Sequence, residues 1–150
     1  MTSTHQIALR TAAVLWVIWG LVHMFAGVMT MAQDTSAAVA GIADAVDASL
    51  LVAEYHPGVG AIINQHGFNL LWIGTFTLVG AVFIWKASAM AILMTAIVGW
   101  VTDVGYFIFI DLGGFANFFP GTVMTIVSTA AVILSLWVYF AALKPGASGT

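Results

Sequence analysis

The sequence predicts an all-α, polytopic membrane protein: an antiparallel bundle of four transmembrane helices, with a short extracytoplasmic amphipathic helix between the first and second. Three observations predict this fold class. Of the 150 residues, 62% are apolar and only 6% are charged, whereas soluble domains carry roughly a quarter charged residues. Four apolar stretches reach the length of about 20 residues that a spanning helix needs. The three basic residues all fall on one side of the membrane that these stretches imply.

Each predicted span is bounded by a charged or polar residue. The spans cover residues 11–31, 61–85, 89–110 and 122–143. They belong to a single domain over residues 1–150, since a chain of this length normally forms only one. A cleaved signal peptide is the alternative for the first span. Because the apolar region of a signal peptide has only about 7–15 residues, we expect a permanent helix instead.

The distribution of charge predicts the orientation. Arg10, Lys86 and Lys144 lie on one side, while the predicted opposite side carries Asp34, Asp44, Asp47, Glu54 and Asp111. Because basic residues are retained in the cytoplasm, we expect both termini there. The expected location is the plasma membrane of a bacterium or archaeon, with the lipid bilayer as the main partner.

The three connections differ in length. The turn at residues 86–88 is so short that the second and third spans must be neighbours. In the long connection 33–60, apolar residues recur at helical spacing and predict one amphipathic helix that lies over the outer end of the bundle, with Asp34, Thr35 or Ser36 as its cap; the apolar residues are Val39, Ile42, Val46, Leu50 and Ala53. The sequence His56-Pro57-Gly58 is predicted to end it. The phenylalanines of the loop 111–120 are expected to enter the outer interface.

Strongly polar side chains occur within three of the spans. At a rise of 1.5 Å per residue, His23, Asn69, Asp103 and His66 fall about 3, 5, 6 and 9 Å to the outer side of the span midpoints. Such residues are costly in hydrocarbon, usually face the protein interior and are functional by default. Their similar depth predicts a single polar layer in the outer half of the bundle.

Helical spacing predicts that these residues face one another. The three stripes expected to face inward are Trp16, Trp19, Gly20, His23 and Gly27; Ile62, His66, Asn69, Ile73 and Phe76; and Thr95, Gly99, Asp103, Tyr106 and Ile110. The resulting pocket has His23, His66 and Asp103 as candidate metal ligands. Its candidate cofactor-binding residues are His23, His66, Trp19 and Tyr106. Further polar lining is expected from Asn69, Gln65 and Ser128.

Several chemistries suit this set of side chains. Two histidines and one carboxylate can bind iron, copper or zinc, and two histidines on neighbouring helices can ligate haem b. A His–Asp pair can also relay protons, or act as acid and base on an amphipathic lipid substrate. A purely structural alternative is that these residues only hydrogen-bond neighbouring helices and hold the bundle together.

The sequence therefore favours a membrane protein that binds a metal or haem, with redox chemistry as a candidate role. It leaves open whether the protein is an enzyme. One alternative is a proton- or small-solute-translocating subunit, working as a homo-oligomer. Another is a structural or accessory subunit of a larger membrane complex. There is no basic patch of the kind that binds nucleic acid. The absence of cysteine excludes disulfides and thiolate metal sites.

A short motif in the first span resembles a known group of proteins. The sequence Trp19-Gly20-Leu21-Val22-His23, together with the chain length and the four predicted spans, is similar to the small four-helix bacterial membrane proteins that include the DoxX-like families. The resemblance implies this layout, and no site residue is carried over from it.

Overall fold

The structure, a computed structural model, describes residues 1–144, and these residues form helices without any strand. Four helical segments are long and apolar enough to cross a membrane, which confirms the four predicted apolar helices: Ser3–Ala32, Pro57–Trp85, Ala89–Asp111 and Phe118–Leu143. The first and second are α1 (Ser3–Ala32) and α3 (Pro57–Trp85). The other two contain wide π-type turns, in the order α4 (Ala89–Thr95), η2 (Ala96–Trp100), α5 (Val101–Tyr106) and η3 (Phe107–Asp111), then η4 (Phe118–Thr122), α6 (Val123–Val138) and η5 (Tyr139–Leu143).

Glycines bring the backbones of α1 and α3 into contact. A Cβ atom at Gly20 would lie 2.8 Å from the Gly74 carbonyl oxygen, and one at Gly27 would lie 2.5 Å from that of Gly67. The glycines repeat every seven residues on each helix, and the partners follow in reversed order, so the two helices run in opposite directions. Small residues at such spacing allow close packing in a bilayer, where apolar surface gains little from leaving lipid. The glycine repeat therefore decides which face of α3 is buried against α1.

The third apolar segment changes partner halfway along its length. Its first part, α4, packs against α3, whereas α5 packs mainly against α6. The change occurs across the π-type turns of η2, a kind of local widening that commonly bends a helix. Within η2, Gly99 leaves room for the indole of Trp16, since a Cβ atom there would lie 2.6 Å from Trp16 Cζ3.

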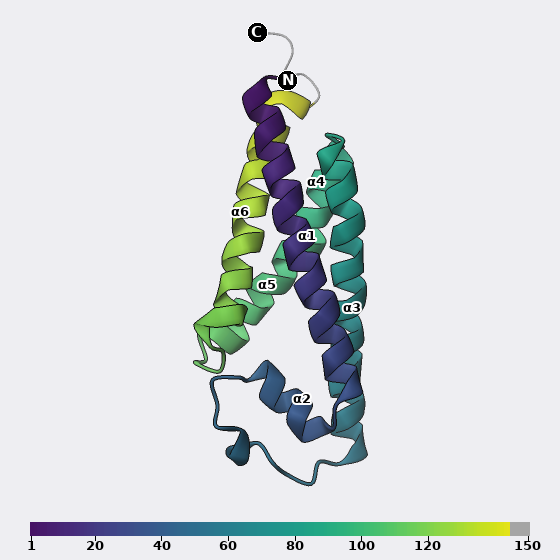
Figure 1. The fold of residues 1–150 in the computed structure, drawn as a ribbon, viewed down its shortest axis with the longest axis vertical. Coiled ribbons are helices and arrows are strands. Elements are labelled where there is room, and N and C mark those ends of the chain that lie inside the picture. Colours follow the sequence, from purple (N-terminus) through teal and green to yellow (C-terminus); the bar gives the residue numbers. More distant parts are fainter. Residues whose placement is uncertain (145–150) are drawn as a thin grey trace.

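As a result, the bundle is closed at one end and splayed at the other. In Figure 1, α1 crosses from beside α6 at the top to beside α3 at the bottom, and α5 lies with α6. The pair α1/α3 and the pair α5/α6 therefore separate toward the end that carries α2 (Thr35–Ile42). The start of α1 and the end of η5 lie together at the opposite end (Figure 1).

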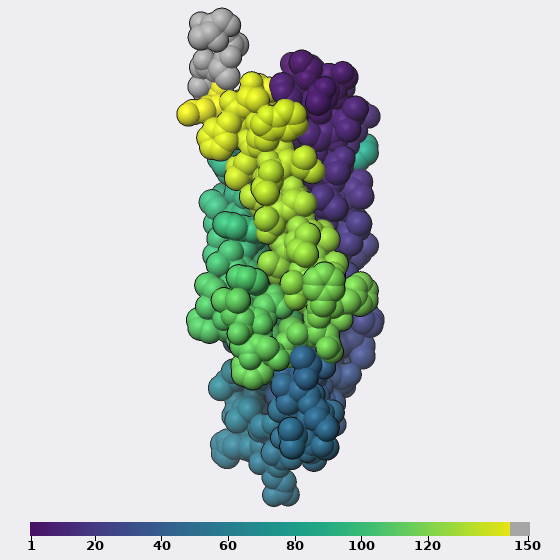
Figure 2. Space-filling model, turned by 90° about the vertical axis from the view of Figure 1, so that its left-hand side faces the viewer, coloured from purple at the N-terminus to yellow at the C-terminus, as the bar shows by residue number. Residues whose placement is uncertain are grey.

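The connection between α1 and α3 covers the splayed end. Of the three candidate caps, it is Asp34 that caps α2, by accepting a hydrogen bond from Ala37 N at 2.9 Å. The predicted amphipathic helix is too long, however, because α2 ends at Ile42 and only the turn η1 (Ala48–Leu50) follows. Figure 2 shows this blue segment packed beneath the green loop that precedes α6.

Polar contacts with that loop explain why α2 ends early. Asp44 Oδ1 accepts a hydrogen bond from Asn117 N at 2.6 Å, and Asn117 Nδ2 donates to Asp44 O at 2.8 Å. The backbone N–H of Ala45 donates to Phe115 O at 3.0 Å. These bonds hold residues 43–45 in a non-helical conformation and tie the strap, residues 43–56, to the loop 111–120. His56, predicted to end the amphipathic helix, instead caps α3.

Candidate functional site

A cavity of about 620 Å³ lies between the two helix pairs. Its walls come from α1, α3, α5, η3, η4 and the start of α6, and α2 and Asp44 contribute at the splayed end. A volume of this size is typical of pockets that hold a small organic molecule. Most of the side chains around it are apolar, so its few polar groups are the candidates for specific contacts with a ligand.

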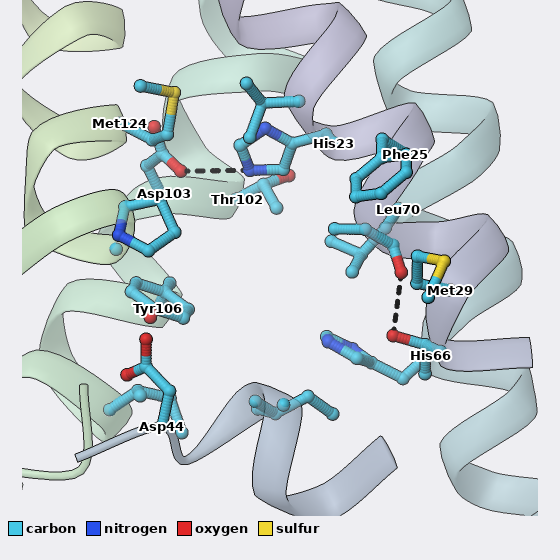
Figure 3. A pocket seen from close by; sticks show the side chains of 18 of the residues that line it. His23, Phe25, Met29, Asp44, His66, Leu70, Thr102, Asp103, Tyr106 and Met124 are labelled. Carbon is cyan, nitrogen blue, oxygen red and sulfur yellow. Dashed lines mark hydrogen bonds and ion pairs between the residues drawn. The ribbon is translucent and has the colours of Figure 1, made fainter. Parts of the chain in front are cut away.

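The inner end of the cavity carries a linked set of three polar side chains. Asp103, only 2% exposed, accepts a hydrogen bond on Oδ2 from the indole N–H of Trp19 at 2.6 Å. Its other oxygen, Oδ1, lies 3.7 Å from His23 Nε2. The imidazole of His23 stacks on the Trp19 ring, with centroids 3.5 Å apart. Trp19 thus fixes both His23 and Asp103, and Figure 3 shows the latter two converging from different helices.

The hydrogen bonds of this set determine where its protons are. His23 Nδ1 lies 2.9 Å from Trp19 O, and because a carbonyl can only accept, Nδ1 carries a hydrogen. Nε2 of His23 and Oδ1 of Asp103 then face each other, and both would be acceptors if the imidazole were neutral and the carboxylate ionised. Two acceptors in contact in a buried site are unfavourable. The pair is therefore expected to share one proton and to carry no net charge.

The pair is close enough to interact but too far apart for a direct hydrogen bond. A separation of 3.7 Å exceeds the upper limit of about 3.2 Å for a good N–H···O bond. An oxygen atom placed on the cavity side could hydrogen-bond to both groups. The inner end of the cavity therefore offers an incomplete hydrogen-bonding site to a ligand.

The remaining walls are mainly apolar, with polar residues again near the splayed end. In Figure 3, Tyr106 and Asp44 lie on the side of Asp103, whereas Met29, Leu70 and His66 lie on the opposite side. The cavity thus has two polar ends, His23 with Asp103 and Asp44 with Tyr106, joined by an apolar middle.

The structure brings together some of the predicted site residues and separates others. His23, Asp103 and Trp19 are in contact, and His66 and Tyr106 also line the cavity. The three residues predicted as further polar lining, Asn69, Gln65 and Ser128, do not line the cavity, although Ser128 is buried beside Asp103. Asn69 accepts from the indole of Trp72, Gln65 is exposed, and buried Ser128 donates to Thr125 O.

The stripe containing His66 faces inward only in part: Ile62 is 66% exposed, whereas His66 lines the cavity and Ile73 belongs to the core. The core-facing side of α3 consists instead of small residues such as Gly67, Gly74 and Thr77. The spacing of polar residues did not identify this side of α3, because close glycine packing against α1 sets the rotation of the helix.

The metal prediction gains no support from the geometry. Among residues 1–144, no three histidine, aspartate or glutamate side chains lie so that they could bind one ion together. His23 and Asp103 are paired, but His66 lies across the cavity from Asp103 (Figure 3).

Sequence reasoning missed the contribution of the long connection. Ala38, Gly41 and Ile42 of α2 and the adjacent Asp44 all line the cavity. Their amphipathic spacing predicted a helix over the outer end of the bundle, but it did not indicate that the helix lines a cavity. Trp19 was expected to bind a cofactor, but its indole N–H is occupied by Asp103.

Comparison with known proteins gives no relative: no family model, curated protein or solved structure matches the chain. The resemblance to the DoxX-like families therefore receives no support from a family match.

Proposed function

We propose that this chain is an integral membrane protein that binds a small amphipathic molecule in the cavity between its helix pairs. In this proposal the four apolar helices span a plasma membrane as an antiparallel bundle, with both termini in the cytoplasm. The short helix α2 then lies at the extracytoplasmic end. The polar end of the bound molecule lies against His23 and Asp103, and its apolar part lies along the walls formed by α1, α3 and α5.

The observation that carries the proposal is the His23–Asp103 pair at the end of an apolar cavity. A polar pair that served only to hold helices together would be expected to be fully hydrogen-bonded within the protein. Here Trp19 satisfies one oxygen of Asp103 and one nitrogen of His23, while the other oxygen and nitrogen lie 3.7 Å apart on two residues that line the cavity. The site is preorganised, because Trp19 holds both groups before any ligand arrives.

Photolabelling of the protein in lipid nanodiscs tests this proposal. Photoreactive twelve-carbon chains with an alcohol, a methyl ether or a carboxylate head should include at least one that labels cavity-lining segments, such as residues 22–33. The substitution His23→Phe should lower that labelling about tenfold or more, because it removes Nε2 but retains an aromatic ring against Trp19.

Thr102→Val is the matched control for this experiment. Thr102 also lines the cavity, but its hydroxyl donates to Val98 O of its own helix at 2.7 Å. Valine has nearly the same shape, so labelling should be retained. Absence of cavity labelling by all three probes, or equal labelling of His23→Phe and the wild type, would contradict the proposal.

A second candidate function, proton translocation, is favoured by one further observation. Trp16 Nε1 and Thr95 Oγ1 are buried without a hydrogen-bond partner among the described residues. Both residues lie inside the bundle, between the His23–Asp103 pair and the closed end. Buried polar groups without a hydrogen-bond partner are rare. These two could bind water molecules that carry a proton between the cavity and the closed end of the bundle.

The translocation candidate predicts that Asp103→Asn abolishes proton flux in liposomes that contain a pH-sensitive dye and an imposed pH gradient. Asparagine retains an oxygen for Trp19 but cannot exchange a proton. Thr102→Val should conduct like the wild type. Flux that survives in Asp103→Asn, or that is absent from the wild type, would remove this candidate and leave the binding proposal intact.

A further inference from the structure

Two exposed aromatic residues within the apolar helices stand at the edge of the cavity. Phe25 of α1 and Phe109 of η3 both line the cavity, yet they are 67% and 74% exposed. A residue that lines a cavity and is mostly exposed stands at an opening. Since both residues belong to segments apolar enough to cross a membrane, this opening faces hydrocarbon.

A second opening lies beside α2. Gln33 also lines the cavity and is exposed, so an aqueous route competes with the lipid-facing one. Part of this end is closed, because Ala38 of α2 is only 2% exposed and Asp44 is held by Asn117. The apolar middle of the cavity favours a ligand that is concentrated in the bilayer rather than in water.

The charge state of the inner end restricts the head group of the ligand. Because His23 and Asp103 are expected to share one proton and to carry no net charge together, an ionic head group would have no counter-charge there. The basic residues of the chain are Arg10, Lys86 and Lys144, and they lie at the closed end of the bundle. Burying an unpaired charge is far more costly than burying a hydrogen-bonded neutral group.

A hydroxyl matches the two atoms that border the cavity. Its oxygen can accept the shared proton from one partner while its hydrogen is donated to the other. A separation of 3.7 Å between Nε2 and Oδ1 permits one oxygen to lie about 2.8 Å from each of them. An ether oxygen could only accept, and it would leave one of the two atoms without a donor.

We infer that the ligand is a neutral, hydroxyl-bearing, lipid-soluble molecule that enters from the bilayer between Phe25 and Phe109 and places its hydroxyl between His23 and Asp103. This inference rests on the proposed binding function and adds the class of ligand and its route of entry. It makes separate predictions about head-group preference and about the kinetics of access.

Head-group preference is tested by competition against the photoreactive alcohol in nanodiscs, with dodecanol, dodecyl methyl ether and dodecanoate as competitors. Dodecanol should compete at a concentration about tenfold or more below that of the ether, because the ether leaves a buried acceptor unpaired. Dodecanoate should be weaker than dodecanol as well. Equal competition by the ether, or stronger competition by dodecanoate, would overturn the assigned head group, although labelling of the cavity itself would still support the binding function.

The route of entry can be tested cleanly because the natural chain has no cysteine. Phe109→Cys, modified with a bulky lipid-soluble maleimide, should slow labelling by the photoreactive alcohol severalfold or more. Gln33→Cys, modified with a bulky water-soluble maleimide, should leave the rate near that of its unmodified form. The reverse pattern would show aqueous entry and overturn the lateral route, and equal rates in all four samples would overturn it too. The unmodified variants control for the substitutions themselves.

Discussion

Replacing Gly27 with alanine is expected to destabilise the protein by about 3 kcal/mol or more, at the upper end of the usual cost of overpacking. The new Cβ atom would lie 2.5 Å from Gly67 O and 2.6 Å from Leu71 N. Both are backbone atoms of α3, which cannot rotate out of the way as a side chain can. The two helices must move apart, and neighbouring close contacts such as Gly20 with Gly74 are then weakened.

Reversible unfolding in mixed micelles, followed by circular dichroism, measures this effect. Gly105→Ala is the matched control, because a Cβ atom at Gly105 in α5 meets nothing within 4 Å. The control should be as stable as the wild type. If Gly27→Ala unfolds at the same denaturant concentration as Gly105→Ala, the close packing of α1 and α3 is not the main support of the bundle.

The second large effect is expected from Asp103→Leu, which should destabilise the protein by about 1–3 kcal/mol, the cost of leaving a buried hydrogen-bonding group unpaired. Trp19 is fully buried, and its indole N–H donates to Asp103 at 2.6 Å. Leucine fills a similar space but cannot accept this bond. His23 loses its partner at the same time, so stacking on Trp19 would be all that holds the imidazole toward the cavity.

In the same unfolding experiment, Asp103→Asn distinguishes the effect of the hydrogen bond to Trp19 from the effect of the proton shared with His23. Its side-chain oxygen can still accept from Trp19, so most of the stability should be retained. A leucine variant as stable as the asparagine variant would show that the bond to Trp19 contributes little. The asparagine variant is also the one to use in transport experiments, because its fold should be intact.

Composition and apolar spacing were sufficient to predict the four apolar helices. They are local properties, and a stretch of about 20 apolar residues admits few other structures. The same reasoning placed Trp19, His23 and Asp103 toward the interior, where the structure has them. Asn69 and Gln65, by contrast, do not line the cavity. The rotation of α3 depends on glycine contacts with α1, and such contacts cannot be inferred from the polar residues of α3 itself.

The sequence by itself therefore determined that this protein has four membrane-length apolar helices and a group of polar residues at similar depth within them. Only the tertiary structure decided that His23 and Asp103 form a pair, with His66 across a cavity from Asp103, and that α2 lines one end of this cavity. The physical reason is that helix length and hydrophobicity depend on consecutive residues. The cavity depends instead on where α1 leaves α6 for α3 and where η2 turns α5 away from α3, and both follow from contacts between residues far apart in the chain.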